Sequence, residues 1–181
     1  MLVSGIWYLE SPIAILSLPQ TMDVISSLKL LALLLIANGA PVIIRYFLRE
    51  RFSYPLDGGA LFVDGRPMLG AAKTIRGVVG AVTMTAFAAP LIGISIQTGL
   101  MVGLLAMAGD IFSSFVKRRL GIAPSGRASV LDQAPESLVP TIALGHEFAL
   151  GWQDEAFVVA GFLIIGMLLS RISGVFPVRR T

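Results

Sequence analysis

Residues 98–116, TGLMVGLLAMAGDIFSSFV, followed directly by Lys117-Arg118-Arg119, decide the fold. A helix that crosses a bilayer needs about 20 mainly apolar residues, and this run reaches that length with a single ionisable side chain, Asp110. A cluster of basic residues at the end of such a run is typical of the cytosolic face of a membrane. The stretch therefore predicts a transmembrane helix that carries a carboxylate.

Four other runs have the same character, so we predict an all-α integral membrane protein with about five transmembrane helices in a single domain, residues 1–181. Together with 98–116, the predicted spans are approximately 27–48, 77–96, 137–152 and 156–174.

Two segments fit this pattern less well. The span 137–152 is the weakest, because Gly145, His146 and Glu147 interrupt it. Residues 1–24 contain an apolar stretch, 6–18, with Trp7 and Tyr8 near its start and Glu10, Ser11 and Pro12 within it, so they predict a segment at the membrane interface rather than a span.

Composition supports this class. Of the 181 residues, 55% are hydrophobic and only 14% are charged, with a mean hydropathy of +0.83. Soluble domains carry about 25% charged residues, which argues against a soluble enzyme or a disordered regulator. There is no cysteine, so a disulfide scaffold is excluded. The net charge is only +3 and the basic residues are scattered between apolar runs, so we expect no nucleic-acid partner.

The basic residues also predict the orientation. Two long loops, 49–76 and 117–136, together with Arg45 and the C-terminal end, hold 13 of the 14 Lys and Arg residues and leave only Lys29 for the other side. The positive-inside rule places that face in the cytosol. We therefore expect a multi-pass protein of the cell (inner) membrane, with its N-terminus outside, its C-terminus inside and its active site facing the cytosol.

Asp110 is the strongest candidate for chemistry. Ser113, Ser114 and Lys117 follow it at intervals of three, four and seven residues, which places all four on one helix face. A carboxylate inside the membrane costs about 2.5–3.5 kcal/mol and marks a functional site by default. The alternative is a structural ion pair with a neighbouring helix.

Loop 117–136 adds the acids Asp132 and Glu136 beside the basic triplet. Asp110 and Asp132 would supply hard oxygen ligands for Mg²⁺, which prefers one or two carboxylates together with substrate phosphates. Glu136 is equally well interpreted as an acid favoured by the dipole of a helix N-terminus.

Lys73, Thr74 and Arg76 gather where the second span begins, and the amides of a helix N-terminus favour an anion there. Positive-inside anchoring is the alternative interpretation. In the first span, Pro41 predicts a kink, and Asn38 either satisfies freed backbone or lines a polar cavity.

The motifs resemble a known family. Gly109-Asp110, Ser113, Ser114, Lys117-Arg118-Arg119 and Leu131-Asp132 resemble the signature of CTP-dependent phosphatidate cytidylyltransferases. The CDP-archaeol synthase branch is the more specific match. It is similar in Asn38-Gly-Ala-Pro41, Asp64-Gly65-Arg66, Leu69-Gly70, Lys73-Thr74-x-Arg76-Gly77 and Leu131-Asp132-Gln133.

This resemblance implies a membrane enzyme that transfers CMP from CTP to a lipid phosphate, digeranylgeranylglyceryl phosphate, and releases pyrophosphate. Its partners would be CTP, the lipid phosphate and the bilayer, with a homodimer possible and Mg²⁺ as cofactor. The implied catalytic residues are Asp110, Asp132, Lys117 and Lys73, with Asp110, Asp132 and Glu136 for the metal. The implied substrate-binding residues are Asn38, Asp64, Thr74, Arg76, Ser113, Ser114, Arg118, Arg119 and Gln133.

The sequence departs from the family at one point. The family has a second acid in an Asp-Gln-x-Asp pattern, where this chain has Pro135 followed by Glu136. Either Glu136 replaces that acid or the acid is dispensable.

The rival functions are the same reaction on diacyl phosphatidic acid, a small transporter, and a non-catalytic scaffold. The one-sided clustering of polar residues disfavours a transporter, whose site lies near the membrane midplane between repeats.

Overall fold

The structure is a computed structural model that describes residues 22–122 and 130–175, with side chains up to residue 169. Throughout these segments the chain forms helices and no strand, which confirms the all-α prediction. The predicted interfacial segment lies outside the described residues up to residue 21. The helices are α1 (Val24–Leu48), α2 (Ile75–Ala88), η2 (Ala89–Ile92), α3 (Ile96–Arg119), α4 (Val130–Leu144), η3 (Gly145–Phe148) and α5 (Trp152–Val175).

Short polar side chains fix where the first three long helices begin. Asp23, Thr74 and Ser95 each accept a hydrogen bond from the backbone N–H three residues later, at 3.1, 3.3 and 3.0 Å. Such N-caps satisfy a backbone donor that the helix cannot pair internally. These bonds start α1, α2 and α3.

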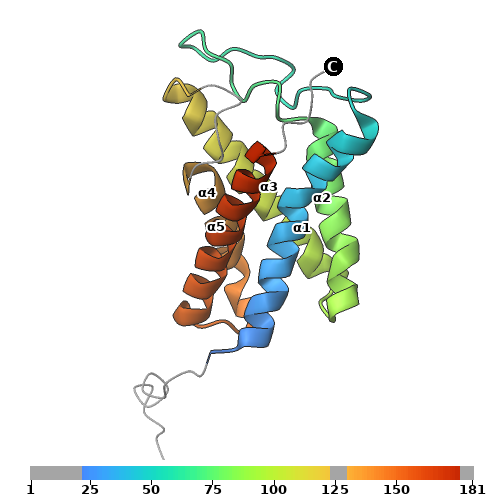
Figure 1. The fold of residues 1–181 in the computed structure, drawn as a ribbon, viewed down its shortest axis with the longest axis vertical. Coiled ribbons are helices and arrows are strands. Elements are labelled where there is room, and N and C mark those ends of the chain that lie inside the picture. Colours follow the sequence, from blue (N-terminus) through green and yellow to red (C-terminus); the bar gives the residue numbers. More distant parts are fainter. Residues whose placement is uncertain (1–21, 123–129, 176–181) are drawn as a thin grey trace, which may run out of the picture.

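The helices form one bundle, with α3 packed against α1, α2 and α4, and α5 packed against α1 and α4. In Figure 1, α3 runs obliquely behind α5 and α1, and the long loop between α1 and α2 covers one end of the bundle. The position of α3 brings Asp110 next to both α4 and the start of α2.

Four helical segments are long and apolar enough to cross a membrane: Val24–Leu48, Ile75–Ile92, Ile96–Arg119 and Trp152–Leu169. α4 has only 15 residues, which is about 22 Å at a rise of 1.5 Å per residue and shorter than the roughly 30 Å hydrocarbon layer. α4 is therefore a short helix inside a bundle of membrane-spanning ones.

The position of α4 corrects one expectation. The helix begins at Val130, inside the predicted loop 117–136, and it ends at Leu144 instead of continuing to residue 152. Its first turns are polar, but they are buried because glycines on the neighbouring helices admit them: Gly109 lies against Pro135, and Gly166 lies against Gln133. Asp132, Gln133 and Glu136 are therefore helical residues.

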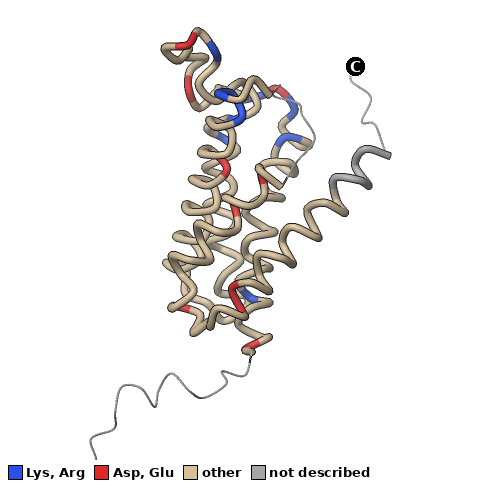
Figure 2. Tube along the Cα trace, turned by 90° about the vertical axis from the view of Figure 1, so that its left-hand side faces the viewer, with Lys and Arg blue, Asp and Glu red and all other residues tan. Residues whose placement is uncertain are grey.

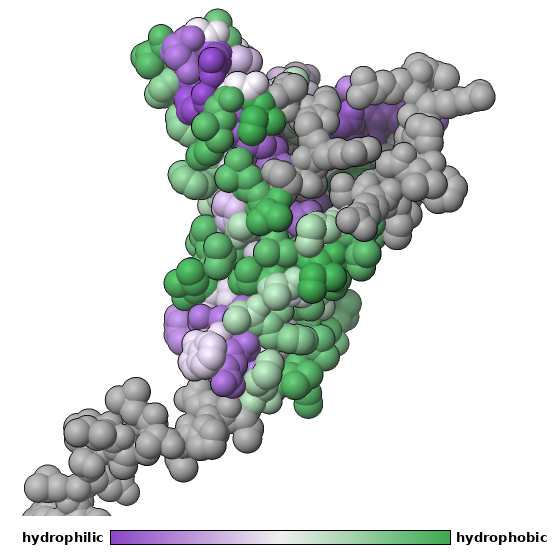
Figure 3. Space-filling view, turned by 60° about the vertical axis from the view of Figure 1, so that its left-hand side comes forward, coloured by the Kyte–Doolittle hydropathy of each residue, from purple (hydrophilic) through white to green (hydrophobic). Residues whose placement is uncertain are grey.

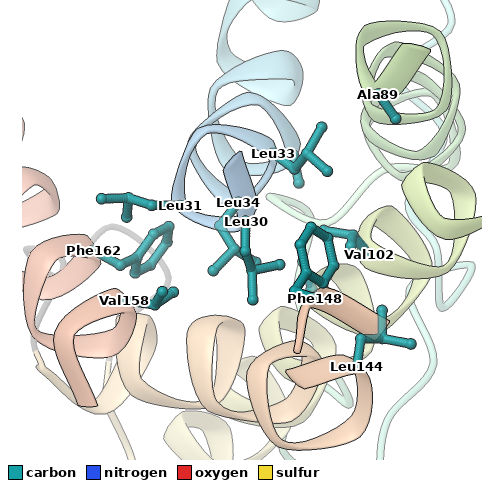
Figure 4. Packing of buried hydrophobic residues seen from close by; sticks show 12 residues of the cluster. Leu30, Leu31, Leu33, Leu34, Ala89, Val102, Leu144, Phe148, Val158 and Phe162 are labelled. Atoms are coloured by element: carbon teal, nitrogen blue, oxygen red, sulfur yellow. The ribbon is translucent and has the colours of Figure 1, made fainter. Parts of the chain in front are cut away.

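The main core lies in the half of the bundle away from the long loop. Leucines of α1 meet Val102 of α3, Phe148 of η3 and Phe162 of α5, all nearly fully buried (Figure 4). Nearer the loop, the contacts use small residues instead, with Ala40, Ala81 and Met107 buried together. Small residues at helix contacts allow close backbone approach, which drives packing inside membranes.

Charge is distributed unevenly along the bundle. Figure 2 shows most Lys and Arg residues at the end that carries the long loop, whereas the opposite end holds mainly acidic residues. Between the two ends the surface is mostly apolar (Figure 3). This pattern is the one expected of helices that pass through a bilayer.

Candidate active site

Two buried ion pairs form the centre of the site. The Lys73 ammonium lies 2.5 Å from each carboxylate oxygen of Asp110, joining the residue before Thr74 to the middle of α3. The two side chains are 23% and 16% exposed. This ion pair brings together two of the predicted catalytic residues that are 37 positions apart.

The second pair joins α3 to α4. Lys117 Nζ lies 2.6 Å from Asp132 Oδ1, and both side chains are 12% exposed. The Asp132 Oδ1 atom is fully buried, so this ion pair lies away from solvent. The four predicted catalytic residues thus lie in two matched pairs at one end of the bundle.

Glu136 adds a third carboxyl group to this cluster. It is only 8% exposed, and its charged neighbours are the Asp110 and Asp132 carboxylates and the Lys73 ammonium. Asp132 and Glu136 are one helical turn apart on α4, so they share a face. Gly109 makes the approach possible, because any side chain there would collide with the Pro135 carbonyl.

Two of the predicted substrate-binding residues, Arg118 and Arg119, hydrogen-bond to the long loop. Arg119 donates 2.6 Å hydrogen bonds to Asp64 Oδ1 and to the Pro67 carbonyl, and it lies over the rings of Phe62 and Phe115, 4.6 and 5.0 Å from their centroids. The Arg118 side chain is buried and donates to the carbonyls of Leu69 and Ile122.

Arg66 forms a hydrogen bond in the opposite sense, from the loop to α3. It belongs to the loop, and its guanidinium donates a 2.6 Å hydrogen bond to the Arg119 carbonyl at the end of α3. We call Asp64, Arg66, Arg118 and Arg119 the loop clamp. It fixes the loop between α1 and α2 on the basic end of α3.

Thr74 and Arg76 also have local partners. The Thr74 hydroxyl caps α2 by accepting the Gly77 N–H, and Arg76 donates to the carbonyls of Arg49 and Arg51 just after α1. α1 continues as a helix through Pro41. The Asn38 amide donates to the Leu34 carbonyl at 3.4 Å, so it bonds its own helix and not the carbonyl that Pro41 leaves free.

The remaining predicted residues line the interfaces around the ion pairs. Ser113 and Ser114 are 1% and 2% exposed, and the Ser113 hydroxyl donates to the Asp110 carbonyl at 2.9 Å. Gln133 is buried with its Oε1 atom unpartnered. It faces Gly166 of α5 and lies next to Asp132.

Asp57 is a structural residue to which the sequence analysis gave no role. Its carboxylate accepts backbone N–H groups from Gly59, Leu69 and Gly70 at 3.0, 2.8 and 3.1 Å. Burial raises the pKa of Asp57, and the backbone hydrogen bonds lower it. The combined effect of the hydrogen bonds is larger, so the pKa lies below the ordinary 3.8. The Asp57-Gly58-Gly59 triplet is the local signal for this turn, because Asp accepts from the backbone two residues on.

The Asp57 turn also positions Lys73. The preceding residue, Leu56, donates its N–H to the Lys73 carbonyl at 2.7 Å, and Ile75 donates to the Tyr54 carbonyl at 3.1 Å. These bonds on either side of Thr74 hold the backbone of Lys73 beside α3.

Asp110, Asp132 and Glu136 have the chemistry that Mg²⁺ requires, since hard oxygen donors are its preferred ligands. Within residues 22–122 and 130–169, no three acidic or histidine side chains are grouped closely enough to bind a metal ion by themselves. The fit is therefore to one or two carboxylates that share the ion with substrate phosphates.

Comparison with known proteins finds relatives that cover most of the chain. Residues 21–171 match the family described as CarS-like, CDP-archaeol synthase. The CDP-archaeol synthase of Hyperthermus butylicus is 33% identical over 145 residues, 77% of this chain and 82% of the relative. That of Sulfurisphaera tokodaii is 39% identical over 115 residues, 61% of this chain and 66% of the relative. A solved structure of an intramembrane enzyme for archaeal membrane lipids biosynthesis superposes with a TM-score of 0.68 and 28% identity. The match covers 81% of this chain and 92% of that one.

Proposed function

The chain belongs to the CarS-like CDP-archaeol synthase family, and we propose that the paired carboxylates and lysines of α3, α4 and the loop before α2 form its active site. The protein is a multi-pass membrane enzyme, a CTP-dependent cytidylyltransferase that makes CDP-archaeol. The observation that supports this site most strongly is the position of two largely buried Asp–Lys pairs along the C-terminal half of α3.

The reaction requires no nucleophile from the protein. An oxygen of the lipid phosphate attacks the α-phosphorus of CTP, a new P–O bond forms, and the bond to the β-phosphate breaks with departure of pyrophosphate. Because the attacking phosphate is already ionised, catalysis consists of positioning and of charge neutralisation. Lys73 and Lys117 are suited to the second task, since each carries a flexible ammonium group beside a buried carboxylate.

Asp110 and Asp132, with Glu136 beside them, would hold Mg²⁺. When bound, this ion neutralises phosphate charge and orients the triphosphate. The burial of Glu136 one helical turn from Asp132 favours Glu136 as the replacement for the acid that Pro135 displaces.

We propose different tasks for the two groups of basic residues. Lys73 and Lys117 contact phosphates, together with the adjacent Ser113, Ser114 and Gln133. The loop clamp instead acts by positioning, because its guanidinium groups already have protein partners. Thr74 and Arg76 hold the start of α2, and with it Lys73, in place.

We further propose that this end of the bundle faces the cytosol, where CTP is available. The concentration of Lys and Arg at the end with the long loop supports that orientation. Digeranylgeranylglyceryl phosphate would then reach the site from the bilayer, and CTP from the aqueous side.

The direct test is product formation by purified protein with Mg²⁺ and radiolabelled CTP. Digeranylgeranylglyceryl phosphate and diacyl phosphatidic acid are supplied in separate reactions. We expect a labelled CDP-lipid from the first, at least a hundredfold less product with Asp110→Asn, and unchanged product with Glu147→Gln, which alters an exposed acid. Preference for the diacyl lipid would overturn the proposed substrate, and full activity of Asp110→Asn would overturn the proposed site.

A further inference from the structure

Both carboxylates proposed to hold the metal are already paired with a lysine. Lys73 contacts both oxygens of Asp110, and Lys117 contacts the buried Oδ1 of Asp132. A divalent cation binds the same oxygen atoms. The cation and the ammonium groups therefore compete for Asp110 and Asp132.

The local charge balance makes that competition unfavourable for the metal alone. Two carboxylates, those of Asp110 and Asp132, lie with two ammonium groups, all four side chains less than a quarter exposed, and the carboxyl group of Glu136 is buried one turn beyond Asp132 on α4. Adding a divalent cation leaves excess positive charge there, and unpaired charge is costly away from water. A triphosphate supplies the anion that each displaced ammonium needs.

The mobile partners in these pairs are the lysines. Asp110 and Asp132 are fixed on α3 and α4, whose backbones are in direct contact at Gly109 and Pro135. A lysine has four rotatable side-chain bonds and three N–H donors, so it can change partner without backbone movement. The lysines can turn from carboxylate to phosphate while the carboxylates stay in position.

We propose that Lys73 and Lys117 are internal counter-ions that keep Asp110 and Asp132 from binding a divalent cation until the triphosphate of CTP is present. Metal and nucleotide then bind with strong mutual dependence. This inference rests on the proposed function. It adds that the protein without CTP binds the metal weakly, and that tight metal binding requires the bound triphosphate.

The test measures Mn²⁺ binding to the full chain in detergent by electron paramagnetic resonance, with and without CTP and without any lipid substrate. Mn²⁺ accepts the same oxygen ligands as Mg²⁺. For the unaltered protein we expect Mn²⁺ affinity to rise at least about tenfold when CTP saturates the site, and CTP affinity to rise by the same factor with Mn²⁺, as linkage requires.

Substitution of the lysines should remove this dependence. Lys73→Met and Lys117→Met should each bind Mn²⁺ alone about tenfold more tightly than the unaltered protein, and CTP should then improve Mn²⁺ binding much less. Lys73→Arg keeps the counter-ion and should retain weak binding of Mn²⁺ alone. Arg45→Met removes an exposed charge at the same end of the bundle and should change neither affinity.

Equal Mn²⁺ affinity in the unaltered protein and both methionine variants would overturn the inference. So would tight Mn²⁺ binding by the unaltered protein without CTP. If a methionine variant fails to fold, as judged by gel filtration, the mutual dependence measured for the unaltered protein still decides the question. Failure of the proposed function is recognised separately, because the unaltered protein would then form no labelled CDP-lipid.

Discussion

Gly109 of α3 lies directly against the Pro135 carbonyl of α4, with no space between them for a side chain. This contact holds the helix that carries Asp110 against the helix that carries Asp132 and Glu136. Packing therefore requires glycine at position 109, directly before Asp110, the proposed metal ligand.

We predict that Gly109→Ala damages both stability and activity. An added methyl group must force α3 and α4 apart, and overpacking of this kind costs about 1–3 kcal/mol. The expected results are a lower melting temperature and at least a tenfold loss of CDP-lipid formation. Gly39→Ala is the matched control, because a methyl group at Gly39 of α1 meets no atom within 4 Å. Normal melting and activity in Gly109→Ala would show that the close approach is dispensable.

The sequence predicted the spans well where apolar residues run without interruption, and poorly where burial depends on a partner helix. α3 is recognisable from residues 98–116 alone. The start of α4 is not, because Asp132, Gln133 and Glu136 resemble a polar loop until Gly109 and Gly166 are known to lie against them.

The same limit applies to the basic residues. Lys117, Arg118 and Arg119 are adjacent in the sequence, and the family resemblance implies a catalytic role for Lys117 and substrate binding for the two arginines. In the fold, Lys117 faces Asp132, whereas the two arginines hydrogen-bond to the long loop. No local pattern separates these roles, since the loop residues that bind the two arginines are about 50 positions away in the sequence.

The loop clamp yields a prediction that separates positioning from substrate binding. If Arg119 acts by holding the loop, then Asp64→Asn, which removes its carboxylate partner, should have the same effect as Arg119→Lys. We expect both variants to increase proteolytic cleavage within residues 58–70 and to lower kcat several-fold. An Asp64→Asn enzyme with an unchanged loop and unchanged kinetics, beside an impaired Arg119→Lys, would instead assign Arg119 to the substrate.

Asp57 predicts an acid-sensitive loop. The pKa of Asp57 is lower in the folded loop than its ordinary value of 3.8, so its hydrogen bonds contribute fully above pH 3.8 and are lost as the pH falls through the folded-state pKa. Hydrogen–deuterium exchange should show protection of the Leu69 and Gly70 amides that declines below about pH 4. Asp57→Asn should lack this decline and protect both amides less at neutral pH. An identical pH profile in the variant would contradict the assignment.

Glu136 provides the most discriminating prediction, because chemistry and stability should respond in opposite directions. A carboxyl group that is 8% exposed beside two aspartates opposes folding when it is ionised, since buried like charges repel and lose their hydration. Glu136→Gln keeps the shape and removes the ionisable group. We expect the melting temperature of the metal-free protein to stay the same or rise, while CDP-lipid formation falls at least tenfold. Glu136→Asp, which keeps the charge on a shorter side chain, should retain more activity than Glu136→Gln. A structural role would give the reverse result, with a lower melting temperature and unchanged turnover in Glu136→Gln. The measurement thus decides whether Glu136 takes over the task of the acid that Pro135 displaces.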